Sequence, residues 1–205
     1  MIMDNAAYWL LTSVVELKYP ISILVSENIE LHFNRESHGL HHQELMSLLN
    51  KLFQHNYLSA CVQGSSCDFT PTTEQVAAAL RGEASLYYGL TLKGGALWED
   101  LSKPQWDLYI VESRDGEGTV EIASANRDLV EECLSLEIDR GYQVDTKTAK
   151  WSTQIPWQAT YWKLLDKGYV VSLRYELDSC ATVEKSTRLL SWESKVNAWY
   201  VPLSN

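Results

Sequence analysis

The sequence contains no cluster of lysine and arginine residues. Its 17 Lys and Arg residues are outnumbered by 27 Asp and Glu residues, which gives a net charge of −10. The imbalance is even along the chain: residues 1–104 hold 6 basic and 11 acidic residues, and residues 105–205 hold 11 and 16. An acidic field repels phosphate groups, so nucleic acid and anionic membrane surfaces are disfavoured as partners.

Long apolar runs and a cysteine framework are also missing. No segment approaches the length of a membrane-spanning helix. The apolar run Ala6–Val15 has no basic residue before it and stops at Glu16, so it predicts a helix and not a signal peptide. The four cysteines follow no disulfide spacing. These absences predict a cytoplasmic protein with reduced thiols and no membrane segment.

Signatures of catalysis are equally scarce. The Gly94-Gly95 pair lacks the lysine and the spacing of a phosphate-binding loop. Neighbouring acids such as Glu99-Asp100 face different directions on a helix, which does not suit an acid/base pair. We therefore expect no enzyme, no catalytic residue and no cofactor.

One segment, residues 32–44, concentrates histidines. His38 and His42 have the four-residue spacing that can chelate a metal on a helix, but Gly39 lies between them and the helix is expected to begin near Leu40. A solvated loop is therefore the favoured interpretation, with no metal ligand assigned, and a metal-dependent hydrolase stays an alternative. The candidate ligands of that alternative are His32, His38, His41, His42 and Glu44, with Cys61 and Cys67 from a neighbouring segment.

A similar phrase occurs three times: an apolar helical run, then glycine or asparagine, then tyrosine at the start of a strand. A glycine or asparagine with positive φ is a common helix terminator, so recurrent capping is favoured over internal duplication. The phrase predicts three helix–strand pairs. They are helix 40–55 closed by Asn56 with strand 57–62, helix 126–141 with Asn126 as N-cap and Gly141 at its end, and helix 157–168 closed by Gly168 with strand 169–177.

The second half of the chain has the pattern of a half-exposed sheet. Runs 106–113 and 119–125 predict two strands joined by a turn, and Asn197–Leu203 predicts a last strand. Residues 169–177 alternate between apolar and polar, which is typical of an antiparallel sheet with one solvated face. Five tryptophans of this half are expected to fill its core, and a groove lined by them is the alternative: Trp151, Trp157, Trp162, Trp192 and Trp199.

The first half carries a resemblance in the stretch YYGLTLKGGALWEDLSKP. Here a strand, residues 86–90, is followed by Leu-Thr-x-x-Gly, with Thr91 and Gly94 at a helix start. Together with helix 40–55 and strand 57–62, this order resembles the winged-helix fold of bacterial transcription regulators. The longer run LTLKGGALWEDLSKPQW is similar to an uncharacterised bacterial protein family. The resemblance implies a wing between the two strands and a recognition helix before them.

The chain departs from that pattern in the region of the wing. The wing is long and predicts a helix of its own, with Thr70 as cap, Pro71 at the first helical position and Gly82 at the end. We therefore predict an α+β chain. A winged-helix-like domain with this helical insertion spans residues 1–104, and a small antiparallel-sheet α+β domain spans residues 105–205.

These patterns favour a non-catalytic cytoplasmic protein that binds another protein, comparable to immunity proteins that neutralise a basic toxin. The first alternative is a winged-helix regulator that reads DNA with residues 41–54. That helix offers Gln43, Asn50 and Gln54 to bases, but Lys51 is its single cation. The second alternative is the metal-dependent hydrolase at residues 32–44.

Overall fold

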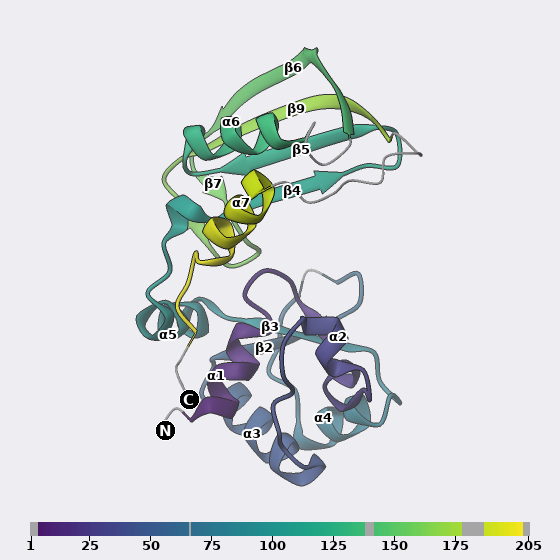
Figure 1. Ribbon diagram of the computed structural model, residues 1–205. Coiled ribbons are helices and arrows are strands. Elements are labelled where there is room, and N and C mark those ends of the chain that lie inside the picture. The colour runs from purple at the N-terminus through teal and green to yellow at the C-terminus, as the bar shows by residue number, and fades with distance from the viewer. Residues whose placement is uncertain (1–3, 66, 138–141, 178–186, 203–205) are drawn as a thin grey trace. The chain divides into compact units, whose positions relative to one another are not determined.

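The computed structural model describes residues 4–65, 67–137, 142–177 and 187–202 (Figure 1). Contacts divide the chain into two units: unit 1 contains residues 1–102, 160–163 and 202–205, and unit 2 contains residues 103–159 and 164–201. Both units combine helices with antiparallel strands, so the chain is α+β. In the described residues, no helix has the length and apolar character needed to cross a bilayer.

Unit 1 holds a three-stranded sheet with the strand order β1-β3-β2, both pairings antiparallel. Its elements are α1 (Asn5–Thr12), β1 (Tyr19–Pro20), the 3-10 helix η1 (Ile21–Val25), α2 (Ile29–Phe33), α3 (His42–Gln54), β2 (Leu58–Val62), α4 (Thr73–Leu80), β3 (Leu86–Leu90) and α5 (Leu92–Ser102).

The junctions around α3 and α5 form as predicted. The apolar stripe of α3 is buried, and Asn56 ends the helix with φ of 57°. Thr91 caps α5, because its hydroxyl oxygen accepts the Gly94 N–H at 3.0 Å. The same hydroxyl donates to the Asn56 carbonyl at 2.6 Å, which joins the end of α3 to the start of α5.

The insertion between β2 and β3 contains the predicted helix, α4, but the predicted cap is wrong. Thr72 caps α4, not Thr70: the Thr72 hydroxyl accepts the Gln75 N–H at 3.3 Å, and the Gln75 carboxamide accepts the Thr72 N–H at 2.9 Å. This reciprocal pair of hydrogen bonds satisfies the backbone N–H groups of Thr72 and Gln75 at once. A cap at Thr70 lacks such a pair. Gly82 follows the helix with φ of 75°.

Unit 2 holds a four-stranded antiparallel sheet with the order β4-β5-β9-β6 and a separate two-stranded sheet of β7 and β8. Its elements are η2 (Trp106–Leu108), β4 (Ile110–Arg114), β5 (Thr119–Ser124), α6 (Arg127–Leu136), β6 (Tyr142–Gln154), β7 (Trp157–Gln158), β8 (Leu164–Leu165), β9 (Gly168–Leu177) and α7 (Thr187–Asn197).

The core of unit 2 lies on one face of this sheet, covered by α6 and α7 (Figure 1). The predicted alternation of β9 is confirmed, because Val171 and Leu173 are buried while Arg174 and Glu176 are exposed. Asn126 caps α6 as predicted, and the predicted end at Gly141 lies outside the described residues. The core residues are Val120, Ile122, Leu129, Val130, Cys133, Leu136, Val171, Leu173, Leu189 and Trp192.

The predicted helix over 157–168 is wrong. Residues 157–158 and 164–165 are the short strands β7 and β8. The aromatic spacing fits a helix, but its members belong to two cores: Trp157 packs in unit 2, and Tyr161 and Trp162 pack in unit 1. Gly168 is not a helix terminator; a Cβ built there would lie 2.2 Å from the Trp157 ring.

The predicted last strand, residues 197–203, is also wrong in its described part. Residues 187–197 form α7, and residues 198–202 form no strand. Leu189 and Trp192 are one helical turn apart and enter the core, which favours the helix. The expected burial in unit 2 is confirmed for Trp157, Trp192 and Trp199. Trp162 is buried in unit 1 instead, and Trp151 is 39% exposed.

Residues 160–163 close unit 1 at the end of α1. The Tyr161 hydroxyl donates to the Val14 carbonyl at 2.6 Å and accepts the Leu90 N–H. The Trp162 indole N–H donates to the Val15 carbonyl at 2.7 Å. Burial raises the pKa of Tyr161, so this hydroxyl keeps its proton and remains a donor.

Candidate functional sites

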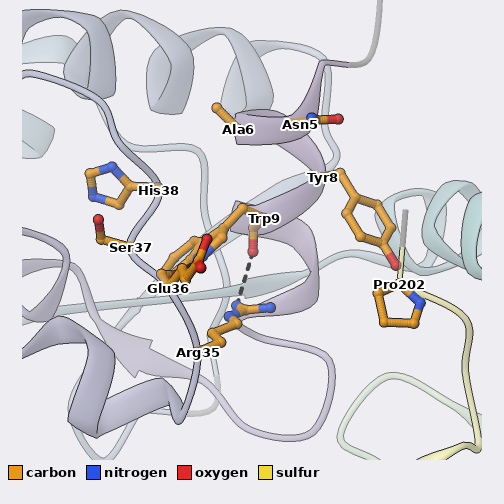
Figure 2. A pocket seen from close by; sticks show the side chains of 9 residues that line it. All are labelled: Asn5, Ala6, Tyr8, Trp9, Arg35, Glu36, Ser37, His38 and Pro202. Carbon is orange, nitrogen blue, oxygen red and sulfur yellow. Dashed lines mark hydrogen bonds between the residues drawn. The ribbon is translucent and has the colours of Figure 1, made fainter. Parts of the chain in front are cut away.

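Two neighbouring surface hollows in unit 1 and one cluster of ionisable side chains in unit 2 are the candidate sites. The first hollow, the Trp9 hollow, has a volume of about 330 Å³ and lies between α1 and the loop that follows α2 (Figure 2). Its lining is Asn5, Ala6, Tyr8, Trp9, Arg35, Glu36, Ser37, His38 and Pro202.

Trp9 organises this hollow. The Arg35 guanidinium lies over the indole, 4.2 Å from the ring centroid, and donates to the Trp9 carbonyl at 3.1 Å. The indole N–H donates to the Glu36 carbonyl at 2.7 Å. A cation over an indole is stabilised by the ring quadrupole, so Arg35 has a structural role in holding the loop against α1.

His38 is fixed in the same loop. Its Nδ1 accepts the Leu40 N–H at 3.0 Å, so the other ring nitrogen, Nε2, carries the proton of the neutral ring and donates to the Leu24 carbonyl at 2.9 Å. The ring also makes an edge contact with Trp9, with centroids 5.3 Å apart. Both nitrogens are occupied, which leaves neither for a metal or for proton transfer.

The second hollow, the Leu24 hollow, also has a volume of about 330 Å³. It shares Ser37 and His38 with the Trp9 hollow, so the loop lies between the two. Half of its ten lining residues come from η1, α2 and the start of α3 and half from the connecting loops, and five of the ten have apolar side chains. The lining is Leu24, Val25, Ser26, Ile29, Ser37, His38, Gly39, Leu40, His42 and Leu45.

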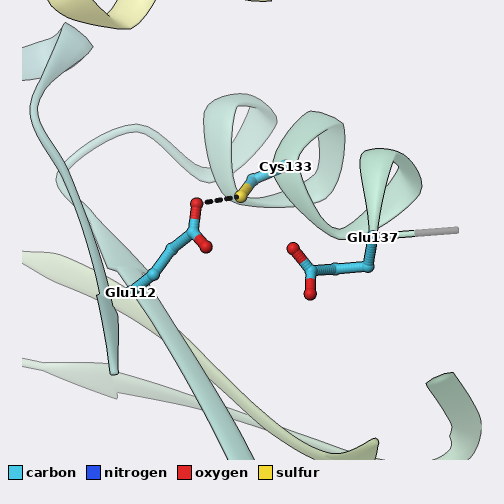
Figure 3. Close-up of side chains that lie close together, drawn as sticks. All are labelled: Glu112, Cys133 and Glu137. Atoms are coloured by element: carbon cyan, nitrogen blue, oxygen red, sulfur yellow. Dashed lines mark hydrogen bonds between the residues drawn. The ribbon is translucent and has the colours of Figure 1, made fainter. Parts of the chain in front are cut away.

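The third candidate is a cluster in unit 2 that joins β4 to α6 (Figure 3). The thiol of Cys133 and carboxylate oxygens of Glu112 and Glu137 lie within 4.8 Å of one another. The thiol donates to Glu112 Oε1 at 3.2 Å, and the Glu137 side chain is 0% exposed. A thiolate with two carboxylates is a ligand set that Zn²⁺ accepts.

Arg114 occupies the position of a cation in this cluster. Its guanidinium contacts Glu137 at 3.0 and 3.3 Å and Glu112 at 3.2 Å. A bidentate arginine balances a buried carboxylate, so the arrangement is stable without a metal. The residues therefore fit a buried ion-pair network better than a metal centre.

Sequence reasoning missed this network. It gave no functional role to Cys133, Glu112 or Arg114. The available signal was the two-residue spacing of Glu112 and Arg114 on a strand, which puts both on the same face as Ile110. Charged residues on the core face of a strand indicate a buried pair.

The residues of the hydrolase alternative are not brought together. In the part of the chain that the structure describes, the cluster in unit 2 is the only group of three or more His, Cys, Asp or Glu ligand atoms close enough to hold a metal. Cys61 is buried and lies 3.9 Å from the Lys18 ammonium, whereas Cys67 is exposed. Residues 32–44 run from the end of α2 through a loop into the first turn of α3, where the Glu44 carboxylate accepts the His41 N–H at 3.0 Å.

The charge of unit 1 is acidic, and most of its cations are already engaged. The unit contains 6 Lys and Arg residues against 11 Asp and Glu residues. Three of these cations form ion pairs, namely Lys18–Asp68, Arg81–Glu83 and Lys163–Glu99. Lys93 donates to the His55 carbonyl at 2.9 Å.

In comparisons with known proteins, no family model, no curated protein and no solved structure matches this chain.

Proposed function

We propose that this chain is a non-catalytic interaction protein that binds a basic protein partner. One observation carries the proposal: unit 1 has a net charge of −5, and its cations are mostly paired or held against aromatic rings. Complementary charge accelerates association and selects against partners of the same sign. The engaged ring nitrogens of His38 and the Arg114 ion pairs support a role without catalysis.

The test is capture and measurement of the partner. The immobilised chain is exposed to lysate of the cells in which its gene occurs, and bound proteins are identified and purified. We expect a partner with an isoelectric point above about 9. Its dissociation constant should rise at least about tenfold between about 0.05 and about 0.5 M NaCl, because salt screens the attraction. A partner set that is acidic, or binding that salt leaves unchanged, contradicts the proposal.

A second candidate function is DNA binding by a winged helix in unit 1. The order α1, β1, α2, α3, β2, β3, with η1 after β1 and α4 inserted between β2 and β3, and the strand order β1-β3-β2 favour it. Gln43, Lys51 and Gln54 are exposed on α3. We rank it second because the acidic unit offers few cations to phosphates. Fluorescence anisotropy with random-sequence duplex DNA at low salt distinguishes the two. Binding that is lost in a Lys51→Ala, Gln54→Ala variant supports this second function.

A further inference from the structure

The Leu24 hollow has the shape and chemistry of a socket for one apolar side chain. Its floor is made by the buried side chains of Leu24, Ile29 and Leu45, and Leu40 is half-buried in its wall. Val25 lines the hollow and is 43% exposed, so apolar surface reaches solvent here. A volume of about 330 Å³ is at the small end of ligand sites, which suits a side chain more than a cofactor.

The surroundings of the hollow are acidic. Exposed Glu27, Glu30, Glu36 and Glu44 are each the immediate chain neighbour of a lining residue. Residues 19–50 contain a single Lys or Arg, and that residue, Arg35, is held over the Trp9 ring. The apolar hollow is thus built from segments of the chain that are rich in acids and poor in cations.

We propose that the Leu24 hollow binds a large apolar side chain, such as Leu, Ile, Met or Phe, from a partner segment that carries Lys or Arg on either side. Buried apolar anchors dominate the energy of interfaces, and charges at the rim set the rate and the choice of partner. A second copy of this chain is a poor occupant, since both units have a net charge of −5. Anionic lipid and nucleic acid are disfavoured for the same reason. This inference rests on the proposed function and names the surface through which it acts.

The experiment uses a displayed library of random 12-residue peptides, selected against the full chain. We expect the selected peptides to combine one large apolar residue with an excess of Lys and Arg. Binding of one selected peptide, labelled with a fluorophore, is then measured for the Val25→Asp and Val62→Asp variants. Val62 is the matched control, because it is a valine of unit 1 with 51% exposure that does not line the hollow.

We expect Val25→Asp to weaken peptide binding by about 10- to 100-fold, which is the usual effect of damaging an apolar anchor site. Val62→Asp should leave the dissociation constant within about twofold. A second matched pair tests the neighbouring acids without touching the socket. Glu30→Gln and Glu74→Gln each remove an acid from the first turn of a helix, and only Glu30 is next to a lining residue in the chain. Glu30→Gln should weaken binding by about threefold at low salt, and the difference should vanish near 0.5 M NaCl, about the point where screening is complete.

The outcomes separate this inference from the proposed function. If cationic peptides are selected but Val25→Asp and Glu30→Gln bind them as well as their controls do, the hollow is not the socket and the proposed function stands. If the selected peptides carry no excess of Lys and Arg, both are overturned. If Val25→Asp fails to fold, the Glu30 and Glu74 pair decides the question alone.

Discussion

The contact between Gly95 and Trp162 tests how the segment 160–163 packs against the rest of unit 1. Gly95 is in the first turn of α5, and Trp162 comes from the segment 160–163. A Cβ built on Gly95 would lie 2.1 Å from the Trp162 ring, a distance at which the ring must move. Trp162 is 7% exposed and is held by its bond to the Val15 carbonyl, so it has little room to yield.

The expected magnitudes follow from this geometry. Gly→Ala in a helix normally stabilises by about 0.5–1 kcal/mol. Here the overlap should reverse the sign, and Gly95→Ala should destabilise unit 1 by about 1–3 kcal/mol. Trp162→Ala removes a buried indole and should cost about 3–5 kcal/mol. Once the ring is gone, the added methyl has space, so Gly95→Ala in the Trp162→Ala background should be neutral or stabilising.

The assay is a double-mutant cycle on urea unfolding, followed by circular dichroism and by hydrogen exchange of amides in α1 and β3. The exchange reports on unit 1 by itself, which matters because two units need not unfold in one transition. We expect a coupling energy of about 2 kcal/mol between the two positions. Costs that simply add within about 0.5 kcal/mol would falsify the claim that the ring and the glycine are in forced contact.

Three further predictions concern other positions. Arg114→Met leaves the buried Glu137 carboxylate without its guanidinium and should destabilise unit 2 by about 3–5 kcal/mol. The double variant Arg114→Met, Glu137→Leu should recover most of this loss. Equal melting temperatures of the single and double variants contradict this prediction. Asn56 has a φ of 57°, so Asn56→Gly should preserve stability and Asn56→Val should lower the melting temperature. A higher melting temperature for Asn56→Val than for Asn56→Gly would contradict a left-handed residue at the end of α3. The pKa of Asp115 is lowered chiefly by the hydrogen bond from the backbone N–H of Thr119. The ionised carboxylate therefore stabilises the fold fully above the pKa that Asp115 has in the unfolded chain. This stabilisation is lost as pH falls through the pKa of Asp115 in the folded chain. The melting-temperature gap between the wild type and Asp115→Ala should therefore narrow from pH 7 to about pH 2.5, and a constant gap contradicts this assignment.

Local sequence patterns correctly predicted the elements whose capping residues and buried residues lie close together in the chain and belong to one core. The end of α3 at Asn56 and the cap of α5 at Thr91 depend on side chains and dihedral angles within a few residues, and both were correct. The alternation of β9 was correct for residues 171–176, where Val171 and Leu173 enter the core and Arg174 and Glu176 are exposed, although Val170 is buried on the opposite face.

The failures have the opposite cause. Trp157, Tyr161 and Leu164 have helical spacing, but no sequence pattern says that Trp157 and Tyr161 belong to different units. Thr70 was the predicted cap of α4, but Thr72 caps the helix because it forms the reciprocal hydrogen bonds with Gln75. The hollows and the Glu112 cluster join segments far apart in the chain, which periodicity alone does not bring together.

The segment 160–163 belongs to unit 1 although it lies in the second half of the chain. A division between residues 104 and 105 leaves every described secondary-structure element whole. Yet Tyr161 and Trp162 supply the hydrogen-bond donors for the Val14 and Val15 carbonyls at the end of α1. A buried carbonyl without a donor costs about 1–3 kcal/mol, and a missing indole leaves apolar surface exposed as well. Unit 1 therefore depends on residues from the second half of the chain, so its stability is a property of the whole sequence and not of its first half.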